Sequence, residues 1–412
     1  MTSHSIHFAF YLVFVVFLPR VTFALPGGTE SILGDVTLAS TAKDLQITAS
    51  DGAILHHLSF DIAADESVRF IQPGTDARVL NRILGEEPTR IDGRLSGNGH
   101  VYFVNPAGIL FGEGAVVEVS KLHAIAGALA DQDFINGVDR YTALSGAIQN
   151  MGSITAEEVV LAGYTLSNSG RIVAQEGLVV LAAGSGLEIA SANDSISVSL
   201  ESPAAGGEGA GALLVVGDLA GQALLQSGVV EASRLEVHAS TMVLSGQASA
   251  QEVNVGNFSS IVQTAGSMDA DILSLEGGSG STDAPTVDMP STSNHIADLR
   301  PSGTFEKLAV RGGNSMQVSS STLNAQAVDL RVYQGDLTLS TPFSPHSADL
   351  DSSLLLAAQG NLILGFDLDN LNFLQRIFYG RNLSAGASPE VNLELDSLVN
   401  LDAVSFGIDD LD

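Results

Sequence analysis

The residue types that most often ligate metals are sparse in this chain. Among 412 residues there are nine histidines and no cysteine. His56 and His57 are adjacent, and neighbouring residues of a strand point to opposite faces, so the two rings cannot readily share one ion. We therefore expect ordinary surface or edge histidines, and neither a resident metal nor a cofactor.

Acidic side chains could instead hold calcium, because some secreted β-helices bind Ca²⁺ through a Gly- and Asp-rich nonapeptide. The nearest match is Gly277-Gly278-Ser279-Gly280 followed by Asp283, and it departs from that repeat. The segment reads better as a solvated loop.

Carboxylates and an arginine on one outer face are the groups with which β-helix enzymes cleave polysaccharides. Asp269, Asp271 and Arg234 are candidates of the right type. Their spacing does not bring them together, so we predict a protein that is not an enzyme. A secreted polysaccharide-cleaving enzyme remains the alternative.

Gly97-Asn98-Gly99 resembles a phosphate-binding loop only superficially. Such a loop needs a following Lys and a helix, and neither is suggested here. We expect a simple turn.

The elements that must position these side chains are short strands. From Asn150 onward a glycine leads a run of alternating apolar residues, at spacings of 18 and 20. In the first two repeats, Gly152, Ile154 and Ala156 correspond to Gly170, Ile172 and Ala174. In the next three repeats, four positions correspond: Gly228, Gly246 and Gly266; Ala232, Ala250 and Ala270; Leu235, Val253 and Leu273; and Val237, Val255 and Leu275. This period predicts an all-β fold, a right-handed parallel β-helix in which like residues stack. A helical repeat does not fit the alternation, and a β-sandwich is the stronger rival.

The charge balance argues against several partners. The net charge is −30, and Lys43, Lys121 and Lys307 are the only lysines. An acidic surface repels phosphate backbones and anionic membranes, so we expect no nucleic-acid partner.

The two ends of the chain differ in composition from its middle. Phe8 to Leu18 is an apolar run too short to span a bilayer, and small residues follow, so residues 1–24 are predicted to be a signal peptide cleaved after Ala24. We expect no transmembrane segment in the mature chain.

Residues 281–303 are rich in Gly, Ser and Pro, and this composition predicts a loop or linker. The short apolar runs in residues 304–412 predict a β-rich segment with further coils and a cap, including a short helix over 371–379.

The run from Leu95 to Ala126 contains the most distinctive motif. At its centre, Asn105-Pro106-Ala107-Gly108 lies between two apolar, strand-like segments. Asn first, Pro second and Gly fourth is the pattern of a type I turn, in which the Asn side chain can hydrogen-bond backbone groups two residues on. A second corner is expected at Gly112-Glu113-Gly114.

This motif and its flanks resemble the filamentous haemagglutinin family, the exported partner in bacterial two-partner secretion (TPS). NPAGILFG is similar to the family's Asn-Pro-Asn-Gly-Ile signature, and the similarity extends to Leu80–Val104 and Ala53–Pro73. It is close from Leu25 to Ala130 and continues as a repeat style to about residue 280. Ala107 stands where the family usually has a second Asn, and the Asn-Pro-Asn-Leu motif of some members is missing.

The resemblance implies a function as well as a fold. It implies that residues 25–280 form a TPS (haemagglutination-activity) β-helix domain with an amino-terminal cap. It further implies an outer-membrane β-barrel transporter as partner, with Asn105, Pro106, Ala107, Gly108 and Ile109 as the recognition motif. The expected protein is secreted through the periplasm to the surface or exterior of a Gram-negative-type bacterium. There it would act as an adhesin or surface protein on a host or cell-surface glycan or protein.

Overall fold

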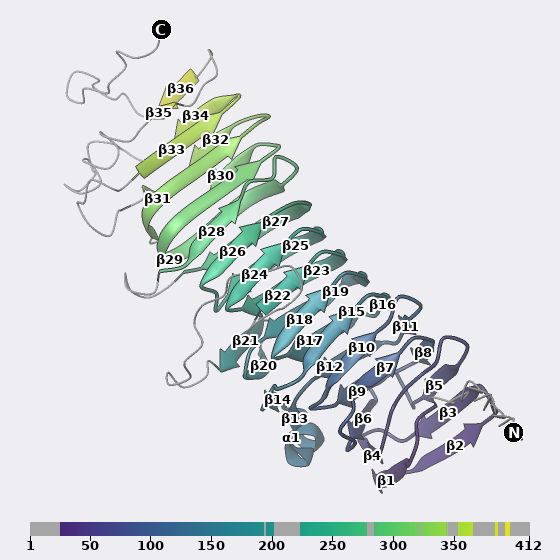
Figure 1. Ribbon diagram of the computed structural model, residues 1–412. Helices are drawn as coiled ribbons and strands as arrows, with labels where there is room; N and C mark the ends of the chain where they lie inside the picture. Colours follow the sequence, from purple (N-terminus) through teal and green to yellow (C-terminus); the bar gives the residue numbers. More distant parts are fainter. Residues whose placement is uncertain are drawn as a thin grey trace, which may run out of the picture.

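The computed structural model describes residues 25–192, 195–201, 223–277, 284–320, 323–342, 344, 353–365, 384–385 and 392–395. The chain winds into an elongated coil whose strands run parallel to those one winding on (Figure 1). The purple amino-terminal strands and the yellow carboxy-terminal strands lie at opposite ends. The parallel β-helix predicted from the repeats is confirmed. The expected signal peptide and the expected helix over 371–379 lie outside the described residues.

The windings build three stacks of paired strands, which we call the first, second and third faces. The first face is made of β3 (Asp44–Ala49), β5 (Ser67–Ile71), β8 (Arg94–Gly97), β11 (Val116–Glu118) and β16 (Ser153–Thr155), followed by the opening parts of the long strands β19 (Arg171–Ala183), β23 (Val229–Ala239), β25 (Gln247–Gly256), β27 (Ser267–Glu276) and β29 (His295–Gly312).

The second face continues from the first after a corner. It is made of β4 (Ala53–His57), β6 (Arg78–Ile83), β9 (His100–Val104), β12 (Lys121–Ile125) and β17 (Glu158–Gly163), the later parts of the same long strands, and β30 (Met316–Val318), β32 (Leu337–Leu339), β34 (Asn361–Leu364) and β36 (Asn392–Leu395).

The third face closes each winding. It is made of β7 (Thr89–Ile91), β10 (Gly108–Phe111), β15 (Ala147–Asn150), β18 (Thr165–Asn168), β22 (Ala223–Gln226), β24 (Thr241–Leu244), β26 (Ser260–Gln263), β28 (Thr286–Met289), the end of β29, β31 (Leu323–Val332), β33 (Ser353–Ala358) and β35 (Ser384–Ala385).

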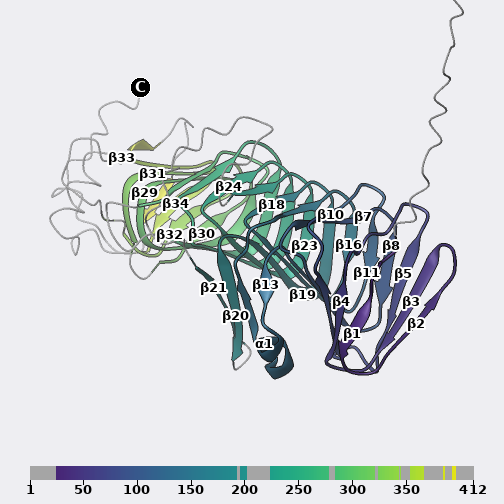
Figure 2. The same cartoon turned by 60° about the horizontal axis from the view of Figure 1, so that its bottom comes forward.

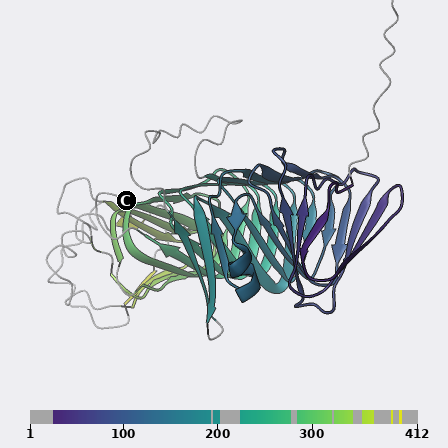
Figure 3. The same cartoon turned by 90° about the horizontal axis from the view of Figure 1, so that it is seen from below.

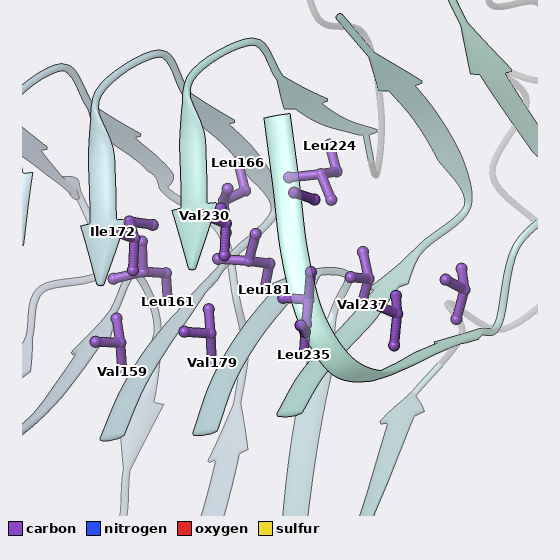
Figure 4. Packing of buried hydrophobic residues seen from close by; sticks show 14 of the residues in the cluster. Val159, Leu161, Leu166, Ile172, Val179, Leu181, Leu224, Val230, Leu235 and Val237 are labelled. Carbon is purple, nitrogen blue, oxygen red and sulfur yellow. The ribbon is translucent and has the colours of Figure 1, made fainter. Parts of the chain in front are cut away.

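The core is a set of apolar columns that run along the inside of the coil. Val159, Val179 and Leu235 form one such column on the second face (Figure 4). The strand register extends it to Val253 and Leu273. All five are buried. Each buried Val or Leu is worth about 1.5–3 kcal/mol of transfer free energy, and the stacking lets every winding bury its inner residues against two neighbours. The register inferred from the 18- and 20-residue spacings is therefore the register of the fold.

A column of glycines marks one corner. Each lies over the carbonyl of the preceding winding: a Cβ added to Gly228 would lie 2.0 Å from Gly170 O, and one added to Gly246 would lie 2.1 Å from Gly228 O. No side chain fits at such distances. The glycine that leads each repeat is therefore required by the close approach of two backbones.

The amino-terminal end is covered by two antiparallel strands. β1 (Glu30–Leu33) pairs with β4, and β2 (Val36–Ser40) pairs with β3. Antiparallel pairing at the end of a parallel stack interrupts the edge that would otherwise be open to other chains. The predicted amino-terminal cap is confirmed.

A small flap lies outside the second face. It consists of β13 (Ala128–Leu129), α1 (Asp131–Asn136), β14 (Asp139–Thr142), β20 (Gly186–Ala192) and β21 (Ser195–Glu201), and its four strands form an antiparallel sheet. The flap projects from one side of the coil (Figures 2 and 3). Phe134 and Tyr141 of the flap pack with Tyr102, Ile125 and Val160 of the second face in an apolar cluster separate from the interior.

The prediction of a loop or linker at residues 281–303 is wrong for residues 284–303, the part that the structure describes. β28 and the opening of β29 lie there and pair with β26 and β27. Val287 and Met289 alternate with polar residues and are fully buried, so this winding obeys the core pattern despite its Ser- and Pro-rich composition. Parallel pairing continues through β34. Within the described ranges, no helix is long and apolar enough to cross a membrane.

Candidate functional site

The predicted turn forms between β9 and β10, where the second face meets the third. Gly108 N donates to Asn105 O over 3.0 Å, which closes the turn. The Asn105 side chain is fully buried. Its Oδ1 accepts from Ala107 N at 3.0 Å, two residues on as expected. Its Nδ2 donates to Glu87 O at 3.1 Å and to Thr89 Oγ1 at 3.0 Å. Asn105 therefore fastens the turn to the preceding winding.

The remaining residues of the motif divide into a hidden and an accessible part. Gly108 has a φ of +119°, and a Cβ there would lie 2.8 Å from Ala147 O, so only glycine fits. Ile109 points into the core and is buried. Pro106 is exposed and Ala107 is half-buried.

Pro106 and Ala107 form part of the wall of a groove of about 490 Å³. The other lining residues are Arg82, Ile83, Leu84, Gly85, Glu86, Val104, Gly127 and Ala128. Leu84 is 53% exposed and adds apolar surface to the groove. Arg82 donates to Leu129 O over 2.8 Å and pairs with Asp131, so it links the groove to the flap. The accessible part of the motif is thus one wall of a partly apolar groove.

The neighbouring histidines point to opposite faces of β4, as expected. His57 is not a surface residue, however. It is fully buried, its Nε2–H donates to Asn81 Oδ1 at 3.1 Å, and its ring packs edge-on against Phe60. Burial lowers the pKa of His57 to about 4, so the ring is neutral at physiological pH. The expectation of a surface or edge site is wrong for His57, because the inward side of β4 faces the core.

The three candidate enzyme residues are not brought together. Arg234 donates to Glu236 over 2.6 Å and lies 3.9 Å from Glu252. Asp269 and Asp271 are exposed on β27, two windings beyond Arg234. At about 4.8 Å per winding, that separation is roughly 10 Å.

The two glycine-rich segments offer no ligand site within the described residues. Gly97-Asn98-Gly99 is a turn in which the Asn98 side chain donates to Gln72 O and accepts from Gln72 N, both at 2.8 Å. Gly277 is described, but residues 278–283 of the calcium-like stretch lie outside the described ranges.

One constellation escaped the sequence reading. His100, His123 and Glu158 come from β9, β12 and β17 and bring one ligand atom each to within 4.8 Å of the others. Each occupies an outward position on the second face, beneath the flap. The intervals of 23 and 35 residues in the sequence carry no recognisable motif. Only the register of three successive windings, known in advance, could have revealed the group.

Burial and hydrogen bonding set the charge of this cluster. Burial, reinforced by the nearby positive groups, holds the pKa of His100 well below its usual range, so that ring is neutral. Burial acts to raise the pKa of Glu158, but the hydrogen bond with His123 and the charge interactions with His123 and Lys121 together outweigh it, and the pKa is lowered. Glu158 is therefore an anion set against the His123 ring.

Comparison with known proteins places this architecture in a family. The model of the TPS secretion domain matches residues 44–266, which is more than half of the chain. The chain belongs to the TPS secretion domain family. Asn105–Ile109, the groove and the flap all lie at or within the matched region.

Two curated proteins are similar in sequence to part of this chain. Both carry the name heme/hemopexin-binding protein and come from Haemophilus influenzae. One is 30% identical over 190 residues, covering 43% of this chain and 21% of the relative. The other is 36% identical over 101 residues, covering 24% of this chain and 11% of the relative. The matched region thus spans about a fifth or less of each relative's length.

A solved structure has the same fold. The HMW1 secretion domain from Haemophilus influenzae superposes with a TM-score of 0.51 and 17% identity, covering 90% of this chain and 98% of that one. This similarity concerns the fold, and the family match carries the function: the family consists of exported proteins of the two-partner type, secreted to the surface or exterior of Gram-negative bacteria. Membership also implies an outer-membrane transporter as partner.

Proposed function

We propose that the outer-membrane β-barrel transporter recognises this TPS chain at the corner formed by Asn105–Ile109 and at the groove beside it. The observation that carries the proposal is the exposure of Pro106 next to Leu84, which is 53% exposed, on the rim of a groove of about 490 Å³. An open, partly apolar groove can accept side chains of an extended protein segment.

The two parts of the corner have different tasks. The Asn105 side chain makes three hydrogen bonds within the fold. In the folded state it therefore shapes the corner and does not contact the transporter directly. Pro106 and Ala107 present the contact surface. In an unfolded chain Asn105 is free as well, and stacking of windings outside the cell then draws the chain forward, because each winding adds its core to the one before it.

The test is an export assay with the transporter co-expressed. Ala107→Asp and Leu84→Asp place a charge on the groove without removing a buried contact. We expect the secreted fraction to fall severalfold while a periplasmic pool of the chain remains. Glu113→Lys, an exposed change at the neighbouring corner, serves as the matched control and should be exported like the parent. Circular dichroism of each purified variant checks the fold. Normal export of both groove variants would overturn the proposal.

We propose adhesion as the work of the exported protein, through binding to a host or cell-surface glycan or protein and without catalysis. A second candidate is the capture of a haem-carrying host protein, for which the names of two relatives are the supporting observation. Binding of the purified chain to immobilised hemopexin, compared with a glycan array, discriminates between them. New reducing ends on a polysaccharide panel would instead favour the enzyme alternative.

A further inference from the structure

The cluster of His100, His123 and Glu158 lies where three windings meet the flap. In the strand register, Lys121 of β12 stands between His100 of β9 and Glu158 of β17. The Lys121 amine is drawn aside to Asp76 Oδ1, at 3.2 Å. The ring of His123, the next outward residue of β12, therefore approaches both His100 and Glu158. Its centroid is 4.3 Å from that of His100, and its Nε2 is 2.7 Å from Glu158 Oε1.

The position of the Tyr141 hydroxyl hydrogen decides which nitrogen of the His123 ring carries the proton. The Tyr141 hydroxyl donates to Asp139 Oδ1 over 3.1 Å. With the hydroxyl in that position, the contact between Tyr141 and His123 Nδ1 uses the His123 N–H as donor; a hydroxyl turned to Nδ1 would instead leave the Nε2–H to donate to Glu158. In the first arrangement the Nε2 of a neutral His123 ring carries a lone pair, and it faces a carboxylate oxygen that is also an acceptor.

His100 adds a buried ring nitrogen without a partner. Its side chain is 6% exposed, and its Nε2 is buried and has no hydrogen-bond partner. A buried polar atom left unpaired costs about 1–3 kcal/mol. One extra proton on His123 would satisfy the contact with Glu158 but would leave His100 Nε2 unpaired. A single cation that accepts all three lone pairs satisfies the whole group.

We propose that His100, His123 and Glu158 bind one divalent transition-metal ion, with Zn²⁺ as the expected occupant. Two imidazole nitrogens and one carboxylate oxygen are a ligand set that zinc accepts, whereas Ca²⁺ and Mg²⁺ prefer oxygen ligands throughout. Ligand atoms around tetrahedral zinc lie roughly 3.3 Å apart, given bonds of about 2.0–2.1 Å. Glu158, whose side chain is 26% exposed, can withdraw from 2.7 Å to that separation. A fourth position on the Glu158 side remains for water.

The surroundings of the ion are those of a supported site. His123 donates its other ring nitrogen to Tyr141, which donates to Asp139, and Tyr102 donates to the same Asp139 oxygen over 3.2 Å. Such outer hydrogen bonds fix the orientation of a metal-bound histidine. Two cations nearby are already engaged, because Lys121 pairs with Asp76 and Arg78 donates to Phe134 O over 2.8 Å. The bound ion ties three windings to the flap and so stabilises the folded chain outside the cell.

The test uses the purified, tag-free chain after treatment with a chelator. Titration with Zn²⁺ in a calorimeter should give one saturable site per chain, and Co²⁺ should give visible absorption bands typical of nitrogen and oxygen ligands. Saturation should raise the melting temperature, because the ion binds only the folded state. Mg²⁺ and Ca²⁺ at the same concentrations should not compete.

Three variants assign the site. His100→Gln and Glu158→Gln should each weaken Zn²⁺ binding by more than about tenfold. His295→Gln, an exposed histidine elsewhere, is the matched control and should bind like the parent. Circular dichroism checks each fold, and partly exposed Glu158 provides a safe variant if His100→Gln misfolds. The absence of saturable Zn²⁺ and Co²⁺ binding to the folded parent, or unchanged affinity in both ligand variants, would refute the site.

Discussion

Asn168 donates a hydrogen bond from its Nδ2 to Gln226 Oε1 over 2.9 Å, across 58 residues of sequence. On its other side it accepts from Asn150 Nδ2 at 2.8 Å. All three side chains are buried in the interior of the coil. The amides thus form a ladder through three windings, and each satisfies its neighbour only when the windings are in register.

We predict that Asn168→Leu destabilises the chain by about 2–6 kcal/mol, because it strands one donor on Asn150 and one acceptor on Gln226 at about 1–3 kcal/mol each. Replacing Asn150, Asn168 and Gln226 together by Leu should recover part of this loss, since no side-chain amide then remains unpaired, although the Gly152 N–H loses its bond to Asn150 Oδ1. Urea unfolding of the parent, the single variant and the triple variant measures both effects. A triple variant no more stable than the single one would contradict this account.

The glycine corner gives a second prediction. Gly228→Ala should cost about 1–3 kcal/mol, because its Cβ would lie 2.0 Å from Gly170 O and two windings would have to move apart. Gly74→Ala is the matched control, since a Cβ there has no atom within 4 Å. It should be neutral or slightly stabilising. Thermal unfolding followed by circular dichroism compares the two, and equal melting temperatures would argue against the close approach.

The glycine and apolar columns were predictable because their cause is local. A residue that faces inward recurs once per winding, so Leu235, Val253 and Leu273 reveal their register through spacing alone. Where a winding carries an insertion, the signal disappears: Val230 pairs with Ile172 from 58 residues away, since β20 and β21 intervene.

The flap and the metal-ligand cluster had no such local cause. On β12, Leu122 and Ala124 face the core while His123 faces outward, yet all three are buried. Covering of the outer face by the flap is a contact between segments distant in sequence, and alternation within one strand does not report it. The prediction of a linker at residues 281–303 was wrong for the opposite reason. There a loop-like composition concealed the alternation of buried Val287 and Met289 with polar residues.

The turn at the candidate recognition site supports a third prediction. Asn105→Ala removes three hydrogen bonds of a fully buried side chain and leaves the Ala107 N–H without its partner. We expect a loss of about 2–4 kcal/mol in the free energy of unfolding. Ala107→Asn, at a half-buried position, should change it by less than about 0.5 kcal/mol. Urea unfolding measures both. An Asn105→Ala chain as stable as the parent would show that the turn does not depend on this side chain.

His57 makes stability depend on pH. Its folded-state pKa of about 4 lies below the ordinary value of 6.5, so the folded chain binds fewer protons than the unfolded chain between these values. Stability is therefore full above pH 6.5 and declines as the pH falls toward 4, by on the order of 3 kcal/mol for this group.

The His57→Gln variant tests this dependence, because an amide can still bond to Asn81 or Thr29 and does not titrate in this range. The variant is expected to be less stable than the parent at pH 7.5. The difference between the two should shrink as the pH falls to 4, since only the parent loses the contribution of a neutral imidazole. Groups such as His100 are common to both proteins and cancel in the difference. Urea unfolding at intervals across this range gives the curve, and a difference that stays constant with pH would show that His57 is protonated as readily in the folded chain as in the unfolded one.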